Sequence, residues 1–453
     1  FYIMLAFGII AVGIIFIDEI LDGIDTFLAW ISYSSKQTTE SYCDIQTADS
    51  EFDLVTNDGS LLSIIEIQGY TALLGKEEFN NIHNKIKNSL SSVLSKPGFS
   101  IQVFFGYNKD NIKNLIYKNF SGTYETIEKL ELDLEDLMNE RIENLSRYCS
   151  EEKIYIALWT KPMSLSKEQQ RRATKDKLQD IRTNKLPVFK YSQNLLAAIP
   201  DLRDSHSSFT RATSNTLTEV GIINDVLNVH QAIKACRDTI DINFTDDNWS
   251  PVLAGDPIKV KVSKNFSGDP SDLLWPSISR QLFPRDGSNI DMKTAKIGDK
   301  IWASVYIDLF PRQVQTFSQL FAKTLQTHIP WRISFLLDSS GLGSLKLKRA
   351  LTSILSFTSE QNRLVNKAVN LLDYIDLNTD DSVIRLRVCA STWAPESDRR
   401  LLRTRSSQLA RAIQSWGSCD VSEFCGDAFE GVASSMLGVY NNSVATPTVA
   451  PLS

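Results

Sequence analysis

The chain has 453 residues, of which 42% are hydrophobic and 23% are charged, as in folded proteins that bury a sizeable core. A formal net charge of −6 at pH 7 excludes a general attraction to nucleic acid and leaves only local basic patches to consider. The six cysteines form no C-x-x-C pair, and neither they nor the four histidines have a zinc-like spacing. We therefore expect reduced thiols in or near the core and a reducing compartment.

The chain starts with an uncharged apolar run from Phe1 to Ile17. As a helix this run would rise about 25 Å, slightly less than the ~30 Å hydrocarbon core of a membrane. We expect residues 1–47 to form a helical segment that is either a membrane anchor or packed on a partner subunit. A signal peptide is the weakest alternative, because no small-residue cleavage site follows. The residues expected to make the contact are Phe1, Leu5, Ile9, Ile10, Ile14 and Trp30.

Residues 48–242 alternate between strand and helix patterns, which predicts a first α+β unit. Two apolar runs, Phe52 to Thr56 and Leu61 to Gln68, flank Asn57-Asp58-Gly59, a strong hairpin signal. The other elements expected in this unit are helices at 77–94 and 166–182, strands at 101–107 and 154–159, and helical additions at 112–148 and 208–240.

Residues 243–298 contain several Pro, Gly and Asp residues and are expected to be an extended connection to a second unit at 299–440. Residues 441–453 are polar and contain Pro, and we expect them to start a linker towards another domain. The elements expected in the second unit are strands at 301–309, 331–337 and 382–392, a helix starting at Pro311, and helices at 345–374 and 396–416.

The last of these strands shows a regular alternation. Apolar residues from Ile384 to Ala390 alternate with Arg385, Arg387 and Cys389, which predicts one buried and one wet face. The order of strands and helices in the second unit repeats that of the first. We therefore expect an α+β fold of two related units in a ferredoxin-like arrangement, each a sheet with helices on one face.

A phosphate-binding loop needs the pattern G-x-x-x-x-G-K-[ST]. The nearest approach, Gly69 to Glu77, has one residue too many and places Glu77 where the hydroxyl should be. A carboxylate there would repel phosphate, so we expect no nucleotide site. Ser339 to Arg349 contains two glycines between a strand and a helix; a plain turn is expected, and a phosphate or lipid-headgroup contact is the alternative.

Two stretches are locally basic. One is Lys161 to Lys185, and the other is a helix that holds Arg399, Arg400, Arg403, Arg405 and Arg411 with no acid after Asp398. Solvated helix faces are the usual reason for such patterns. The alternative is binding to an anionic membrane, an acidic partner or DNA, and for this role the partner-binding residues expected are Arg399, Arg403 and Arg411.

No part of the sequence brings together a nucleophile, a base and an orienting group, or a pair of carboxylates with a clear role. We therefore expect no catalytic residue, no cofactor-binding residue and no metal ligand in these 453 residues.

Several segments resemble the DotO/IcmB family, which includes the TraU protein of I-type conjugation. They are Val305 to Pro311, Ile329 to Phe335, Arg385 to Pro395, Trp416 to Cys419 and Ser443 to Ser453, together with Glu66 to Gly69, Ala72 to Phe79 and Gln102 to Phe105. The resemblance covers most of residues 40–453. The apolar run at Phe1 to Ile17 is not expected of every member.

The resemblance implies the N-terminal region of a conjugation-class ATPase of type IV secretion systems, on the cytoplasmic face of the bacterial inner membrane. It implies a hexamer, or a hexamer of dimers, that powers DNA or protein transfer with other inner-membrane subunits and a second secretion ATPase. ATP and Mg²⁺ would belong to the full-length protein, whose P-loop is expected beyond residue 453. The alternative is a structural inner-membrane subunit that has no ATPase domain.

Overall fold

The computed structural model describes residues 39–72, 75–110, 112–184, 192–242, 244, 246, 248–257, 275–283, 287–311, 316–339, 383–440 and 443–451. The apolar run at the start of the chain and the helix expected at 345–374 lie outside these residues. Of the helices that the structure describes, none combines the length and the apolar character needed to cross a membrane.

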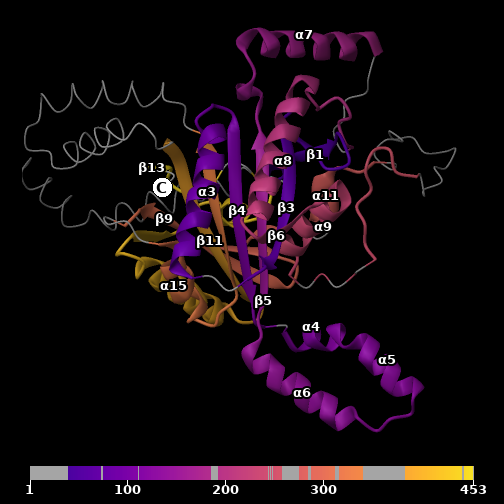
Figure 1. The fold of residues 1–453 in the computed structure, drawn as a ribbon, viewed down its shortest axis with the longest axis vertical. Helices are drawn as coiled ribbons and strands as arrows, with labels where there is room; N and C mark the ends of the chain where they lie inside the picture. The colour runs from indigo at the N-terminus through magenta and orange to yellow at the C-terminus, as the bar shows by residue number, and fades with distance from the viewer. Residues whose placement is uncertain are drawn as a thin grey trace, which may run out of the picture.

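The first half of the chain contains a series of strand, helix, strand, strand, helix and strand, namely β3, α3, β4, β5, α8 and β6 (Figure 1). In the sheet the four strands of this series lie in the order β6-β3-β5-β4, and each pair of neighbours is antiparallel. The short strands β1 and β2 extend the sheet beside the start of β3. The bounds are β1 Ile45–Ala48, β2 Leu54–Thr56, β3 Leu61–Tyr70, α3 Lys76–Leu94, β4 Phe99–Asn108, β5 Glu151–Thr160, α8 Arg203–Glu219 and β6 Ile222–Val226.

The second half repeats this series. Its four strands lie in the order β12-β9-β11-β10, again with antiparallel neighbours, and the short strands β7 and β8 precede β9 as β1 and β2 precede β3. The bounds are β7 Ser288–Asn289, β8 Thr294–Ile297, β9 Lys300–Leu309, α12 Phe317–Leu325, β10 Trp331–Ser339, β11 Val383–Pro395, α15 Arg399–Gln414 and β12 Asp420–Glu423.

The two halves share one sheet. Strand β4 pairs antiparallel with β10, from Ser100 opposite Asp338 to Tyr107 opposite Trp331, and the described residues form a single 13-stranded sheet. The predicted α+β class is therefore confirmed, with the two strand series joined edge to edge at their second strands. Residues 109–150 interrupt the first series after β4, and residues 340–382 interrupt the second at the same step.

Two apolar layers cover the sheet. On one face, α3, α8, α12 and α15 pack over residues such as Ile65, Ile333 and Val388. On the other, α9, α11 and α16 pack over Trp302 and Trp393. Both layers contain residues from both halves of the chain, so the halves share their core. The bounds of the helices not yet given are α4 Ile112–Asn119, α5 Ser121–Lys129, α6 Glu135–Tyr148, α7 Lys167–Asn184, α9 Val229–Ile240, α11 Ile278–Leu282 and α16 Ala428–Ala433, and the 3-10 turns are η1 Thr39–Tyr42, η2 Pro162–Ser164 and η3 Pro200–Leu202.

The segment before β1 packs against the second half of the chain. The ring of Tyr42 lies 4.9 Å from that of Phe429, its hydroxyl donates to Asp427, and the amide of Asp44 donates to the carbonyl of Val439 at 2.8 Å. The expected boundary at residue 47 falls inside β1, and Tyr42, Cys43 and Ile45 belong to the shared core.

The single helix expected at 208–240 is wrong. Helix α8 ends before Gly221, which has a left-handed φ of 88° that favours glycine. Strand β6 follows, and α9 starts anew with a capping box in which Asn228 and Gln231 each accept a hydrogen bond from the other's backbone. A glycine stop and an Asn-x-x-Gln start therefore divide this segment into helix, strand and helix.

The wet face expected on β11 is also wrong in part. Cys389 is buried, and its thiol lies 3.5 Å from the carbonyl oxygen of Gly431. The reason is that α16 and the residues after it cover this face of the sheet. Two further regions differ from expectation: the connection at 243–298 contains α11, β7 and β8, and the expected linker at 441–453 contains β13 (Thr448–Pro451), which pairs with the start of β11.

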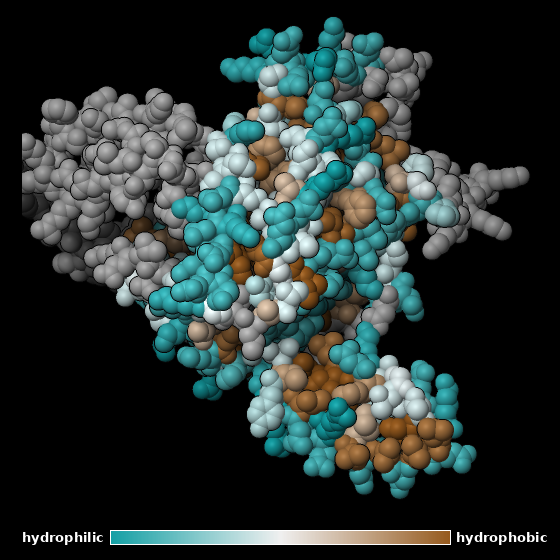
Figure 2. Space-filling model, viewed as in Figure 1, coloured by the Kyte–Doolittle hydropathy of each residue, from teal (hydrophilic) through white to brown (hydrophobic). Residues whose placement is uncertain are grey.

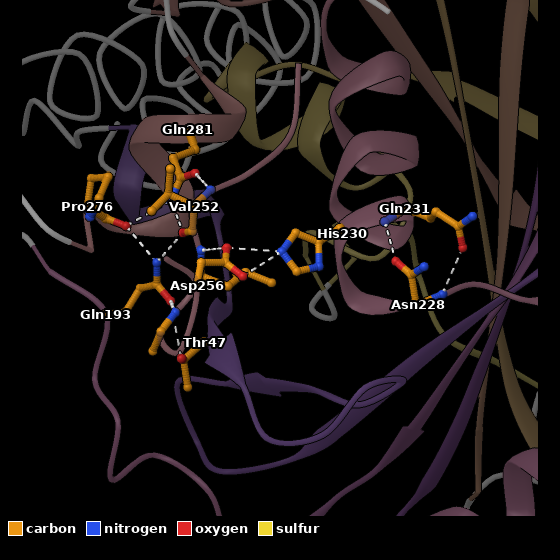
Figure 3. A network of polar contacts seen from close by, with 11 residues as sticks. Thr47, Gln193, Asn228, His230, Gln231, Val252, Asp256, Pro276 and Gln281 are labelled. Carbon is orange, nitrogen blue, oxygen red and sulfur yellow. Dashed lines mark hydrogen bonds and ion pairs between the residues drawn. The ribbon is translucent and has the colours of Figure 1, made fainter. Parts of the chain in front are cut away.

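A polar network fixes the irregular chain beside α9 (Figure 3). The ring of His230 is 3.0 Å from both carboxylate oxygens of Asp256, which also accepts from the amide of Leu253. Gln193 is fully buried and donates to the carbonyl oxygens of Val252 and Pro276 at 2.7 and 3.1 Å. These bonds connect segments far apart in sequence. They give the buried polar groups hydrogen-bond partners, so we assign these groups a structural role.

Candidate functional site

The predicted partner-binding arginines lie on α15. The side chain of Asp398 accepts from the amide of Leu401 at 2.8 Å and so caps the start of the helix. One stripe of the helix packs on the sheet, as predicted, and consists of Leu402, Ser406, Leu409, Ala412 and Ile413.

Arg399, Arg403 and Arg411 are all exposed, and they lie off this buried stripe. Arg399 lies in the first turn of α15, where the helix dipole disfavours positive charge, whereas Arg411 lies in the last turn, where the dipole favours it. Helix stability therefore does not explain Arg399. In the part of the chain that the structure describes, none of the three has a carboxylate within ion-pair distance.

Arg405 has a different role from its neighbours. Its two terminal nitrogens lie 3.0 and 3.1 Å from the two carboxylate oxygens of Asp110, and one also donates to the carbonyl of Trp393 at 2.7 Å. Asp110 follows β4, so this pair connects the second half of the chain to the first. No local pattern in the sequence distinguishes this arginine from the others, because its partner is almost 300 residues away.

The other basic stretch forms α7, which lies apart from the sheet at one end of the molecule (Figures 1 and 2). Ser166 and Gln169 exchange hydrogen bonds at its start, in a capping box. Lys167, Arg171 and Lys175 follow one another on one stripe, which ends at the exposed Leu178. These residues line a shallow surface hollow with Gln170, Thr174 and Gln179.

A helical arm, α4 to α6, projects from the opposite end of the molecule (Figure 1). Its own small core contains Ile112, Ile116 and Ile142. The tip of the arm, residues 130–137, is the sequence Leu-Glu-Leu-Asp-Leu-Glu-Asp-Leu, and every one of these side chains is exposed. Figure 2 shows apolar surface over the arm. An exposed apolar patch rimmed by charge is typical of an interaction site.

The described residues of the Gly69 to Glu77 stretch lie at the end of β3, in the bend after it and at the start of α3. Gly69 lies at a register shift in the pairing of β3 with β6, and Gly75 immediately precedes α3. Glu77 and Glu78 occupy the first turn of that helix, so the residues described here place carboxylates where a phosphate would bind. They do not fit ATP. Most of the Ser339 to Arg349 stretch lies outside the described residues.

A cavity of about 280 Å³ lies at the ends of β4 and β5 under α9. Its lining includes four cations and four carboxylates, so its charge is balanced and gives no preference for an anion. The cations are Lys118, Lys153, Lys234 and Arg332, and the carboxylates are Glu151, Asp238, Asp241 and Asp246. Burial raises the pKa of Asp238.

A buried polar layer joins the two halves, and the sequence did not reveal it. The side-chain nitrogen of Gln102 on β4 donates to the hydroxyl of Ser334 on β10 at 2.7 Å and to the backbone carbonyl of Met436 at 2.8 Å. Arg332 is fully buried, stacks on Trp302 at 4.3 Å and donates to Ser435 and to the carbonyl of Val432. Burial lowers its pKa, because its partners here are neutral. The only sequence signal was a polar residue at every second position of apolar strands.

The expected burial of the cysteines is confirmed for four of the six. All six are free, and Cys43, Cys236, Cys389 and Cys419 are buried, whereas Cys425 is exposed. Burial raises the pKa of Cys389 to about 12 and that of Cys419 to about 11, so these thiols stay protonated and unreactive at neutral pH.

Comparison with models of known protein families finds no match, and comparison with curated proteins finds none either. The surfaces of α15, α7 and the arm therefore provide the basis for a functional proposal.

Proposed function

We propose that this chain is the membrane-proximal assembly region of a type IV secretion or conjugation ATPase. In this role it docks the motor on inner-membrane subunits at the cytoplasmic face of the bacterial inner membrane, and the motor powers transfer of DNA or protein. The resemblance of Val305 to Pro311 and Arg385 to Pro395 to the DotO/IcmB family supports the proposal. ATP and Mg²⁺ would act in another part of the full-length protein.

The exposed arginines of α15 carry this proposal. They lie on a helix whose other side packs over both β9 and β11. This packing fixes the position of the helix and of the arginines on its exposed side. Guanidinium groups bind carboxylates and phosphates well, because their fork of donors matches both. An acidic surface of an inner-membrane subunit is the partner that fits this helix.

The proposal includes a finer account of the fold. Each half of the chain has the strand and helix order of a ferredoxin-like unit, with its first strand between its third and fourth. We regard the chain as two such repeats joined through β4 and β10. In this account, the arm and residues 340–382 are insertions at equivalent places in the two repeats.

Reversing two of these charges tests the proposal. We expect Arg403→Glu with Arg411→Glu to reduce co-purification of inner-membrane subunits and to leave thermal unfolding unchanged, because both side chains are exposed. Association of the unaltered chain should weaken with salt, since the Debye length falls from about 10 Å at 0.1 M to about 3 Å at 1 M.

The matched control is Lys85→Glu with Lys96→Glu. It makes the same change in net charge at exposed positions in the first half of the chain, and it should co-purify normally. If the α15 variant also assembles normally, these arginines are ordinary solvated residues and the proposed docking role is wrong.

A further inference from the structure

Two exposed surfaces at opposite ends of the molecule complement each other. The tip of the arm, residues 130–137, holds four acids and four leucines and no basic residue. The α7 stripe holds Lys167, Arg171 and Lys175 and ends at Leu178, whose exposed fraction is 51%. Figure 1 shows α7 and the arm at the two ends of the long axis, so they cannot meet within one molecule.

The leucines of the tip lack partners of their own. Leu130, Leu132 and Leu137 are 62%, 47% and 59% exposed, and none belongs to the small core of the arm. Burying these leucine side chains against a partner would be favourable, because it removes apolar surface from water. The surrounding acids keep this patch soluble and select a basic partner over another apolar surface.

A helix cap places Glu131 on the surface. It follows the end of α5 with a left-handed φ of 52°. The amides of Glu131 and Leu132 donate to the carbonyls of Glu128 and Ile127 at 3.2 and 3.1 Å, so these bonds of the cap fix the start of the tip.

The spacing of the charges matches as well. Successive basic residues on the α7 stripe are four positions apart, which is about 6 Å along a helix. Residues 132–134 of the tip are not helical, and two residues that are two positions apart lie at most about 7 Å from each other. Glu131 and Asp133 can therefore face two neighbouring cations of the stripe.

The two acids of α7 whose side chains the structure describes lie off this stripe. Glu168 and Asp176 lie on the neighbouring stripe with Arg172, which is paired with Asp201 at 2.8 Å. Within the described part of the chain, no carboxylate lies within ion-pair distance of Lys167, Arg171 or Lys175. The three cations thus form a surface of one sign.

From these observations we infer that the arm tip of one copy of this chain binds the α7 stripe of a second copy. The contact joins two different surfaces, so it is head-to-tail and generates a ring or a filament. This inference deepens the proposed assembly function by naming the two surfaces through which copies of the chain bind each other, and it rests on that function only for its biological purpose.

Charge exchange between two variants tests it. The arm variant carries Glu131→Lys with Asp133→Lys, and the helix variant carries Arg171→Glu with Lys175→Glu; all four positions are exposed. Sedimentation velocity on the 453-residue chain should show self-association that weakens at high salt. Each variant alone should self-associate at least tenfold more weakly, because its two altered positions then face unaltered charges of the same sign on the other surface.

An equal mixture of the two variants should associate again, since the altered tip can then bind the altered stripe and the unaltered tip the unaltered stripe, with opposite charges at the exchanged positions in both contacts. Circular dichroism verifies that each variant is folded. The inference is overturned if the unaltered chain is monomeric, if either variant alone associates normally, or if the mixture fails to associate; the last result would indicate a different protein as the occupant.

The α15 variant separates this inference from the proposed function. Arg403→Glu with Arg411→Glu should self-associate normally, because it leaves both the tip and α7 unchanged. Loss of co-purification with intact self-association would support docking through α15. Normal co-purification of the α15 variant would overturn the docking role. Failure of the charge exchange would overturn the head-to-tail contact. The two results are independent of each other.

Discussion

His206, at the residue scale, connects α8 to the sheet. Its ring is fully buried, with one nitrogen 2.8 Å from the hydroxyl of Ser63 on β3 and the other 2.8 Å from that of Thr160 on β5. Burial lowers its pKa to about 4, although Asp53 at 3.5 Å favours the charged form. The neutral ring can donate to one hydroxyl and accept from the other, so it satisfies both neighbours.

This burial predicts a specific pH dependence of stability. The unfolded state takes up the proton with a pKa near 6.5, and the folded state only near pH 4. The stabilisation is therefore complete above about pH 6.5 and is lost as pH falls towards 4, with about 2 kcal/mol lost between pH 7 and pH 5. Urea unfolding at several pH values measures this loss.

The comparison variant for this residue is His206→Gln. It cannot take up a proton, so its stability should fall less steeply between pH 7 and pH 5, even if it is less stable at every pH. Equal slopes for the two proteins would mean that His206 does not titrate in this range.

At the scale of elements, the arm is a separable insertion. Strands β4 and β5 are paired up to Asn108 opposite Glu151, so the two strands on which the arm is mounted already lie side by side. The arm has its own small core and shares none of the residues of the two main apolar layers. Its folding therefore depends little on the sheet, and the sheet depends little on the arm.

We expect the sheet to fold without the arm. Replacing residues 112–148 by a short Gly/Ser loop keeps Asp110 and its pair with Arg405, and turns β4 and β5 into a simple hairpin. The thermal midpoint should stay within about 4 °C of the full chain. A chain that no longer unfolds cooperatively would show that the arm is needed for the fold.

At the scale of the whole molecule, the joint between β4 and β10 makes the two halves one cooperative unit. Both apolar layers contain residues from both halves, and Gln102 connects the strands at the joint to the segment that follows α16. Its side-chain oxygen also accepts from the amide of Gly438 at 2.8 Å. Domains that share their core in this way should unfold together.

Replacing Gln102 by Leu tests this cooperativity. The change leaves the buried amide of Gly438 and the carbonyl of Met436 without their partner, and we expect the free energy of unfolding to fall by about 3 kcal/mol. Hydrogen exchange should show the same loss of protection in β5 of the first half and β11 of the second.

Gln408→Leu is the matched control, because Gln408 is exposed on α15 and its replacement should leave exchange nearly unchanged. Loss of protection confined to the first half in Gln102→Leu would contradict the single cooperative unit and indicate two independently stable domains.

Local signals in the sequence determined much of this architecture. Apolar periodicity placed most strands and helices, because alternation and helical spacing are local properties of the chain. The repeated order of elements indicated two related units for the same reason. The buried stripe of α15 and the exposure of Arg403 and Arg411 also followed from helical spacing alone.

Only the tertiary structure decided how these elements combine. The pairing of β4 with β10, the contact of Arg405 with Asp110 and the burial of Arg332 all depend on residues far apart in sequence, about which local patterns carry no information. The same holds for the opposite placement of α7 and the arm: the sequence shows one as basic and the other as acidic, but their distance apart follows from the sheet between them.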